Sequence, residues 1–181
     1  DAPFILTQLP MYEANAEEDD KCWAGIREQQ ALVAEQVPNT YMNVLIDCGE
    51  FDNIHPTDKL TVGDRMAALC LEHVYGRPCH ADGPKMQTVT GEDAQVRVTF
   101  SGQPLQVKGT EIALFELAGA DEAYHPAQAE LCGEHEVIVH SAEVSAPQYI
   151  RYAYTNFGKV TLFDSYGLPV APFRRGKVLA V

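Results

Sequence analysis

Basic residues and long apolar runs are both scarce in this sequence. Lysine and arginine together number 13 against 26 aspartates and glutamates, which gives the 181-residue chain a formal net charge of -13 at pH 7. Phosphate backbones are bound largely by Lys and Arg, so this balance argues against nucleic acid as a partner. No apolar run approaches the roughly 18 residues of a membrane-spanning helix, and no basic-then-apolar leader opens the sequence. We therefore expect no membrane role.

Paired cysteines are also missing. The five cysteines are odd in number and none belongs to a Cys-x-x-Cys: Cys22, Cys48, Cys70, Cys79 and Cys132. This pattern indicates neither a zinc site nor a disulfide framework. What the sequence does contain is the composition of a globular protein, 46% hydrophobic and 22% charged. Its length is enough for one ordinary domain or two small ones.

The first part of the chain, residues 1–82, alternates strand-like and helical patterns. Its two short apolar runs, 4–9 and 42–47, have the length of buried strands. A helix is predicted between them, starting after the acidic run 17–20, ending at Pro38 and burying one face formed by Trp23, Ile26, Gln30, Val33 and Val37. A second helix, with Thr57 or Asp58 as its N-cap, ends at Gly76 and carries His73 on its apolar stripe. The order β-α-β-α predicts a parallel sheet with covering helices.

Two strands are too few for a stable parallel sheet, which needs both faces covered and normally more strands. The chain also opens with Asp1-Ala2-Pro3 and enters a strand-like run at once, without an initiator Met. We expect this half to be part of a larger sheet within a longer protein, although a processed terminus would give the same opening.

After Asp82-Gly83-Pro84 the pattern changes to short strands separated by glycine-containing turns. Residues 95–100 alternate apolar and polar side chains, and further strands are predicted at 86–90, 104–108, 111–118, 127–131, 136–140, 149–155 and 160–164. Many short strands at this spacing favour an antiparallel sandwich. The expected fold is therefore a partial parallel α/β segment followed by an antiparallel β-sandwich-like domain.

The loop after the run 42–47 contains the residues with the clearest chemistry. Ligands of open α/β sheets bind beyond the carboxyl ends of the strands, and Asp52 and His55 lie in this position. An Asp three residues before a His can hold the imidazole by its Nδ1–H, which leaves Nε2 to take a proton from a serine hydroxyl. Asp47 is a competing carboxylate. The plain alternative is that a polar loop before a helix favours Asp for capping alone.

The segment from Asp47 to Pro56, followed by Lys59, Gly63 and Arg65, resembles the last motif block of the sialate O-acetylesterase family, which belongs to the SGNH hydrolases. The resemblance extends over nearly the whole chain: Pro3-Phe4, Gln8-Leu9-Pro10, Trp23, Arg27, Gln30, Phe115 to Gly119, Ala127, Ala129, Pro147, Ile150-Arg151-Tyr152, Gly167-Leu168-Pro169 and Pro172-Phe173-Arg174. It implies that residues 1–82 are the C-terminal part of an SGNH esterase domain, that 83–175 form a β-rich C-terminal domain, and that 176–181 are a tail.

The resemblance further implies hydrolysis of acetyl esters on a sugar, with His55 as the general base and Asp52 as the carboxylate that orients it. No metal or organic cofactor is implied. The partners implied are an O-acetylated sugar and the remaining N-terminal part of the same protein, and a secreted, periplasmic or lysosomal location would fit. The family's serine lies in a Gly-Gln-Ser-Asn-like block that is absent here. The four serines, Ser101, Ser141, Ser145 and Ser165, all fall in the β-rich half. We therefore expect the isolated chain to be inactive.

Two other functions remain open at this point. The β-rich half could be a non-catalytic carbohydrate-binding or scaffolding module, or the esterase could act on acetylated plant polysaccharide. The segment Asp121 to Pro126 mimics the Asp-x-x-His-Pro block with one residue too many, and we interpret it as a structural turn. The alternating aromatic residues of 149–154 are expected to pack rather than to stack on sugars.

Overall fold

The computed structural model describes residues 2–13, 21–176 and 179–180, so the acidic run 17–20 lies outside the described residues. The chain folds into two compact units. Unit 1 consists of Asp1–Asp82 and Thr155–Gly158, and unit 2 of Gly83–Tyr154 and Lys159–Val181. A short segment from within the β-rich half of the sequence therefore belongs to the α/β unit.

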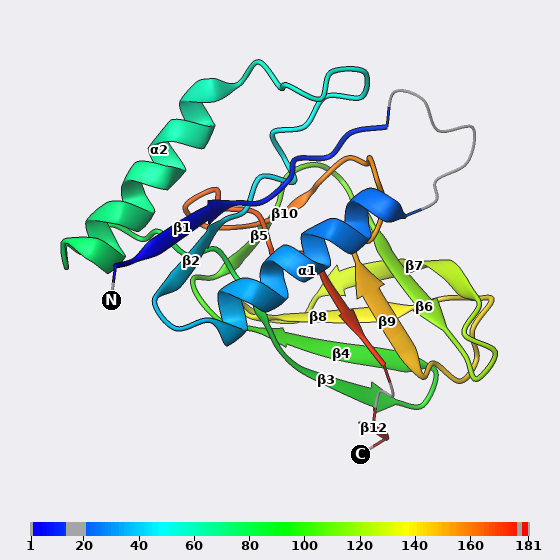
Figure 1. Cartoon of the computed structure of the whole chain (residues 1–181). Helices are drawn as coiled ribbons and strands as arrows, with labels where there is room; N and C mark the ends of the chain where they lie inside the picture. Colours follow the sequence, from blue (N-terminus) through cyan, green and yellow to red (C-terminus); the bar gives the residue numbers. More distant parts are fainter. Residues whose placement is uncertain (1, 14–20, 177–178, 181) are drawn as a thin grey trace. The chain divides into compact units, whose positions relative to one another are not determined.

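Unit 1 has the predicted order β-α-β-α (Figure 1). Strand β1 (Phe4–Thr7) is followed by helix α1 (Cys22–Gln36), strand β2 (Thr40–Asn43) and helix α2 (Lys59–Leu69), which continues into the π-helical turn η1 (Cys70–Val74). The two strands are parallel, in a register that runs from Phe4 opposite Thr40 to Thr7 opposite Asn43. The predicted parallel α/β segment is confirmed.

Strand β2 ends earlier than its apolar run. A strand was expected over 42–47, but β2 stops at Asn43 and the chain then turns, with the Cys48 amide donating to Leu45 O at 3.0 Å. Leu45 and Ile46 are nevertheless buried. Their burial in a turn produces the same apolar run as burial in a strand, which periodicity alone does not distinguish.

Helix α1 buries only part of the predicted face. Ile26 and Val33 are each 45% exposed and Val37, just after the helix, is 49% exposed, whereas Ala24 and Arg27 are buried. The reason is that the buried face is attached by polar groups to the chain that follows β1. The helix is therefore rotated from the orientation that the apolar pattern predicts: Trp23 and Gln30 of the predicted face are still partly buried.

Three residues of α1 hold the segment after β1 in place. The indole N–H of Trp23 donates to Pro10 O at 2.6 Å, and Gln30 both donates to Thr7 O at 3.3 Å and accepts from the Leu9 amide at 2.9 Å. Arg27, which is fully buried, donates to Pro10 O at 3.4 Å and to Thr155 O. These bonds satisfy backbone groups that have no partner in a regular ladder. They also give a physical role to three positions on which the family resemblance rests.

Replacing Arg27 with methionine is expected to lower the free energy of unfolding by about 2–4 kcal/mol, because buried carbonyl groups then lose their donors. Chemical unfolding of the 181-residue chain would show a lower midpoint with an unchanged slope. The control variant is Arg77→Met, because the Arg77 side chain is exposed. Equal midpoints for the two variants would contradict the role given to Arg27.

Helix α2 begins and ends where the sequence predicts. Asp58 is the N-cap, its carboxylate accepting from the Thr61 amide at 3.0 Å, and Gly76 follows the last turn with a φ of 64°. His73 stacks on Tyr41 with ring centroids 4.1 Å apart, and its Nε2 lies 2.7 Å from Asp82. His73 is thus packed against a neighbouring ring, with its side chain 21% exposed.

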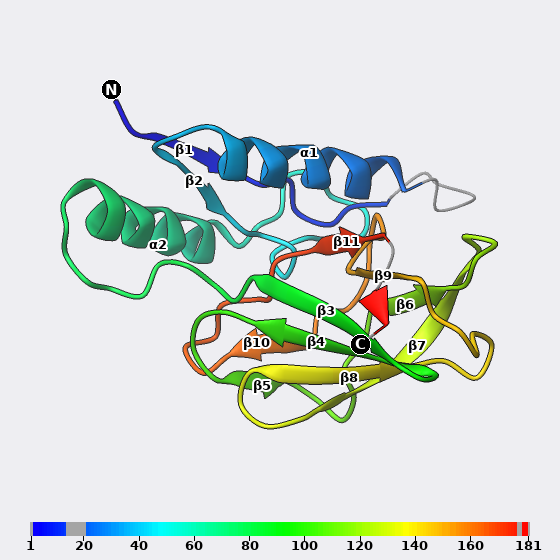
Figure 2. The ribbon, with the colours of Figure 1, turned by 90° about the horizontal axis from the view of Figure 1, so that it is seen from below.

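Unit 2 is built from antiparallel strands (Figure 2). In chain order they are β3 (Met86–Glu92), β4 (Gln95–Phe100), β5 (Leu105–Val107), β6 (Phe115–Ala118), β7 (Tyr124–Leu131), β8 (Glu136–His140), β9 (Tyr149–Tyr152), β10 (Leu162–Asp164), β11 (Phe173–Arg175) and β12 (Leu179–Ala180). The large sheet has the order β11-β9-β6-β7-β8-β4-β3-β12, and β5 pairs with β10 separately. Seven of its strands are antiparallel, and β12 adds a parallel edge to β3. The predicted antiparallel sandwich-like architecture is confirmed.

The core of unit 2 comes from alternating residues of these strands. On β4, Val96, Val98 and Phe100 are buried, as the alternation predicts. The ring of Phe173 on edge strand β11 lies 6.1 Å from that of Phe100 and 6.2 Å from that of Phe115, although β11 and β4 are far apart in the sheet order. The sheet therefore curls until its two halves pack face to face.

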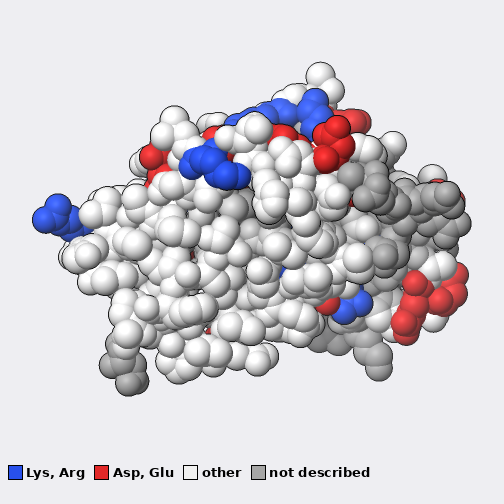
Figure 3. Space-filling model, turned by 45° about the horizontal axis from the view of Figure 1, so that its top comes forward, with Lys and Arg blue, Asp and Glu red and all other residues white. Residues whose placement is uncertain are grey.

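One face of the molecule shows few charged groups. Figure 3 shows a face on which uncharged atoms dominate and the few acidic and basic side chains are scattered. Several arginines are bound by carboxylates, as in Arg151–Glu116 at 2.7 Å and Arg97–Glu92 at 2.8 Å. Among the described residues, no helix is both long enough and apolar enough to cross a membrane.

Candidate functional site

The loop that joins β2 to α2, residues 44–58, holds both residues that the sequence nominates for catalysis. Its entrance is fixed by Arg65 on α2, whose two terminal nitrogens each lie 2.7 Å from an oxygen of Asp47 and which also donates to Val44 O at 3.0 Å. Burial alone would lower the pKa of the Arg65 guanidinium, but the hydrogen bonds and charge of Asp47 raise it overall. Asp47 is thus engaged in holding the loop.

Cys48 is the one buried cysteine of unit 1, and its thiol is held in the unreactive form. Burial, reinforced by the charge of Asp47, raises the pKa of Cys48 to about 12. Thiolate rather than thiol is the nucleophile, and at pH 8 about one molecule in 10⁴ would carry it. A cysteine that stands seven positions from His55 is therefore a poor candidate for the missing nucleophile.

Alkylation with iodoacetamide at pH 8 is expected to leave Cys48 unmodified while it labels the exposed Cys22, Cys79 and Cys132. Peptide mass mapping measures the modification at each position. Unfolding in guanidinium should make the four thiols react alike, which serves as the control. Labelling of Cys48 in the folded chain at the rate of the exposed thiols would refute the protected state.

Gly49 lets the loop cross the segment after β1 at close range. A Cβ at this position would lie 2.1 Å from Met11 O and 2.6 Å from Met11 N, distances that no side chain tolerates. Met11 itself is buried. The glycine therefore allows two backbone segments to touch, which sets the direction in which the loop leaves the sheet.

Glu50 closes the loop on itself. One of its carboxylate oxygens accepts from both the amide and the hydroxyl of Thr57, each at 2.6 Å, and the other accepts from the Asn53 side chain at 3.0 Å. Asn53 in turn accepts from the His55 amide at 2.9 Å. This clamp joins the two ends of residues 50–57 and orders the backbone that carries Asp52 and His55.

The clamp depends on the charge of Glu50. The hydrogen bonds from Thr57 and then from Asn53 lower the pKa of Glu50 below its ordinary value. A carboxyl with a lowered pKa in the folded state stabilises that state above the unfolded pKa of about 4.3, and this contribution is lost as the pH falls through the lower folded value. We expect the Thr57 amide resonance to titrate with a midpoint below about 4.3. A midpoint at or above that value, or the same titration in Glu50→Gln, would show that the clamp does not form.

Asp52 and His55 lie exposed on this braced loop. Pro56, directly after the histidine, is buried. Within the described residues, no hydrogen bond or ion pair joins the side chain of Asp52 to that of His55. The structure thus places the two residues three positions apart on one ordered and accessible loop, and their catalytic roles stay predictions.

Phe157 brings the segment Thr155–Gly158 to the same loop. Its ring meets that of Phe51 edge to face at 5.4 Å, and the Phe51 carbonyl accepts from the Glu13 amide at 3.1 Å. Three separate stretches of chain therefore support the position just before Asp52. Sequence reasoning missed Phe157 because it lies more than a hundred residues away, in the half predicted to be β-rich.

The other nominated residues lie in unit 2. Asp121 and His125 occupy the turn between β6 and β7 and the start of β7, as the structural interpretation of that segment predicted, although both also line a surface pocket of this unit. The serines are dispersed over the unit. Ser141 donates to Pro126 O at 2.9 Å and Ser101 bonds with the backbone of Lys85 at 3.3 Å. Unit 1 contains no serine in its sequence.

Comparison with protein-family models and with curated proteins gives no match. Among solved structures, the chain matches a carbohydrate acetylesterase from Xanthomonas citri with a TM-score of 0.88 and 34% sequence identity. The match covers 96% of this chain and 41% of the other, so the chain spans less than half the length of that protein. This likeness extends over nearly all of the chain, which also carries the ordered loop with the exposed Asp52 and His55. We conclude that the chain resembles part of a carbohydrate acetylesterase.

Proposed function

We propose that this chain is part of a carbohydrate O-acetylesterase of the sialate O-acetylesterase type, and that it supplies the general base His55 and its orienting carboxylate Asp52. The observation that carries the proposal is the likeness to the Xanthomonas citri enzyme, which extends over 96% of the chain at 34% identity. The ordered loop adds support, because a general base has to be both accessible and fixed in place.

The chemistry follows from the two side chains. In the complete enzyme, Asp52 would accept a hydrogen bond from the Nδ1–H of His55, a bond that the two side chains do not make in the described structure. Nε2 would then remove the proton of a serine hydroxyl as its oxygen attacks the acetyl carbonyl. His55 then protonates the departing sugar oxygen, and the acetyl group remains on the serine. A water molecule, deprotonated by His55, cleaves this acyl-enzyme and releases acetate. In each step the transferred proton is taken up or given back by the imidazole of His55.

The nucleophile is proposed to lie outside this chain, in the remaining part of the same polypeptide. Unit 1 has no serine, and the thiol of Cys48 is protonated at neutral pH. The donors that would stabilise the oxyanion belong to the same missing part in this proposal. The length of the Xanthomonas citri protein leaves ample room for both.

The surface of unit 1 supports a larger α/β domain. Of the large hydrophobic residues that are exposed in the described structure, eleven belong to unit 1: Phe4, Ile26, Leu32, Val33, Val37, Phe51, Ile54, Leu60, Leu71, Val74 and Tyr75. Leu60 is 75% exposed and Tyr75 70%. Both helices and β1 thus present apolar side chains, which is typical of a surface covered by further elements. We propose that the covering elements are additional strands and helices of the same esterase domain.

Hydrolysis of an aryl acetate tests the proposal. The 181-residue chain alone is expected to hydrolyse it no faster than buffer, whereas the complete polypeptide should turn it over and release one acetate per event. Hydrolysis by the short chain alone would disprove a nucleophile outside it. A complete polypeptide that cleaves no acetyl ester would disprove the esterase proposal.

The sugar is a separate question. The two cations that follow His55 most closely in the sequence are engaged, Lys59 with Pro56 O and Arg65 with Asp47. Neither is placed to receive the carboxylate of a sialic acid. A panel that compares O-acetylated sialic acid with acetylated xylan on the complete polypeptide would decide between the sialate and the plant-polysaccharide substrate, by the ratio of the two kcat/KM values.

A further inference from the structure

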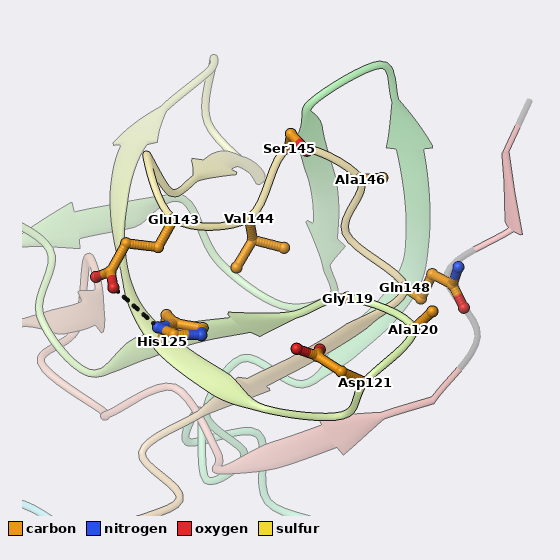
Figure 4. Close-up of a pocket in the computed structure, with 9 residues that line it drawn as sticks. All are labelled: Gly119, Ala120, Asp121, His125, Glu143, Val144, Ser145, Ala146 and Gln148. Atoms are coloured by element: carbon orange, nitrogen blue, oxygen red, sulfur yellow. Dashed lines mark hydrogen bonds and ion pairs between the residues drawn. The ribbon is translucent and has the colours of Figure 1, made fainter.

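Unit 2 contains a surface pocket of about 360 Å³ that the ester chemistry does not use. It lies between the turn that follows β6, residues 119–121, and the connection between β8 and β9, residues 143–148. Figure 4 shows His125, Val144 and Asp121 pointing toward one another across this space. Its volume falls within the range of roughly 300–1,000 Å³ that small-molecule sites occupy.

The lining is polar and carries charge of one sign. Asp121, Glu143, His125, Ser145 and Gln148 contribute polar side chains, and no lysine or arginine among the described residues lines the pocket. Two carboxylates disfavour an anionic ligand, because like charges repel at short range. A metal ion is also disfavoured, since no three His, Cys, Asp or Glu side chains in the described part of the chain are placed to hold one. Carboxylate oxygens accept hydrogen bonds well, so the pocket suits a neutral ligand that carries several hydroxyl groups.

Three of these polar groups have hydrogen-bond partners within the unit. Nδ1 of His125 lies 3.0 Å from Oε2 of Glu143, so the imidazole donates to this carboxylate, whose side chain is 63% exposed. Asp121 is held by the Ala123 amide, which donates to its Oδ1 at 3.2 Å.

The two walls are themselves hydrogen-bonded. The Gln148 amide donates to Ala118 O at 2.8 Å, the Glu122 amide donates to Gly119 O at 3.2 Å, and the Ser141 hydroxyl donates to Pro126 O at 2.9 Å. Between them Val144, only 5% exposed, offers an apolar surface to the pocket. An apolar floor with polar walls matches a sugar ring, which has C–H groups on its faces and hydroxyls at its edge.

We propose that this pocket binds an uncharged sugar unit, with Asp121 and Glu143 accepting hydrogen bonds from its hydroxyls and Val144 packing against its ring. Such a site would retain the chain on a neutral polysaccharide, whether or not the chain takes part in ester hydrolysis. No aromatic side chain lines the pocket, so the affinity for one sugar unit is weak, with a Kd on the order of 1 mM.

Titration of the 181-residue chain, followed by NMR, tests the site. The probes are the methyl glycosides of glucose, galactose, mannose and xylose, each raised to about 50 mM, with N-acetylneuraminic acid as the anionic comparison. At least one neutral glycoside should produce saturable shifts at residues 119–125 and 143–148. Asp121→Asn and Glu143→Gln should each weaken that binding about tenfold, since each removes a charged acceptor. The control variant is Glu134→Gln, because the Glu134 side chain is exposed and lies outside the pocket. This variant should bind the glycoside as tightly as the unaltered chain does.

Three outcomes would overturn the proposal. The first is the absence of saturable shifts with all four glycosides. The second is binding that maps to other residues or that survives both pocket substitutions. The third is binding of N-acetylneuraminic acid as tight as that of the best neutral glycoside, which would contradict the electrostatic argument. The amide spectra of the variants show whether each remains folded.

Discussion

Replacing His55 with alanine in the complete polypeptide is expected to reduce kcat for an aryl acetate by about 10⁴-fold or more. Without the imidazole, no group takes the serine proton as the acetyl carbonyl is attacked, and the attacking oxygen remains a weak nucleophile. His55 is exposed on the 44–58 loop, so its removal should not disturb the core. The measurement is initial-rate kinetics together with thermal unfolding of the same variant.

The matched control is His80→Asn, another histidine of unit 1 but outside the loop. Asparagine is chosen because His80 has a φ of 56°, which asparagine tolerates better than alanine. This variant should keep kcat within about twofold of the unaltered enzyme, because it removes no group from the reaction. Full activity in His55→Ala would end the assignment of His55 as the general base.

Asp52→Asn is expected to lower kcat roughly 10³- to 10⁴-fold while leaving the midpoint of unfolding unchanged. An amide would offer its NH₂ group or a weaker acceptor to Nδ1 of His55, so the tautomer with a free Nε2 would no longer be favoured. Asp52 is exposed and makes no hydrogen bond within the described residues, so its carboxylate contributes little to stability.

Asp47→Asn provides the comparison, because Asp47 is the other carboxylate of the loop. It is bound by Arg65 on both oxygens, with side chains only 11% (Arg65) and 16% (Asp47) exposed. The substitution should lower the free energy of unfolding by about 1–3 kcal/mol. A reversed result, in which Asp47→Asn loses turnover at full stability and Asp52→Asn keeps it, would transfer the orienting role to Asp47.

Much of the fold could be predicted because its signals are local. Proline and glycine limit the helices, Asp58 caps α2, and alternation along β4 marks a half-buried strand. The errors arose where long-range contacts decide. Ile26 and Val33 of α1 point outward because Arg27 and Trp23 bind the backbone near Pro10, and no sequence period contains that attachment.

The site divides in the same way. Asp52 and His55 are nominated by their spacing and by family resemblance, since both lie within one short motif, and their catalytic roles stay predictions. Their supports cannot: Arg65 binds Asp47 across 18 positions, and Phe157 reaches Phe51 from the other half of the sequence. Glu50 and Thr57 lie only seven positions apart, yet a clamp of this kind has no helical or strand period to reveal it.

The most direct measurement is a crystal structure of the complete polypeptide, solved with the loop 44–58 and the remainder of the esterase domain both resolved. The proposal predicts a serine Oγ from outside this chain within about 2.6–3.2 Å of Nε2 of His55, with an Asp52 oxygen at a similar distance from Nδ1. A histidine ring turned away from every serine, with Asp52 bonded elsewhere, would contradict it.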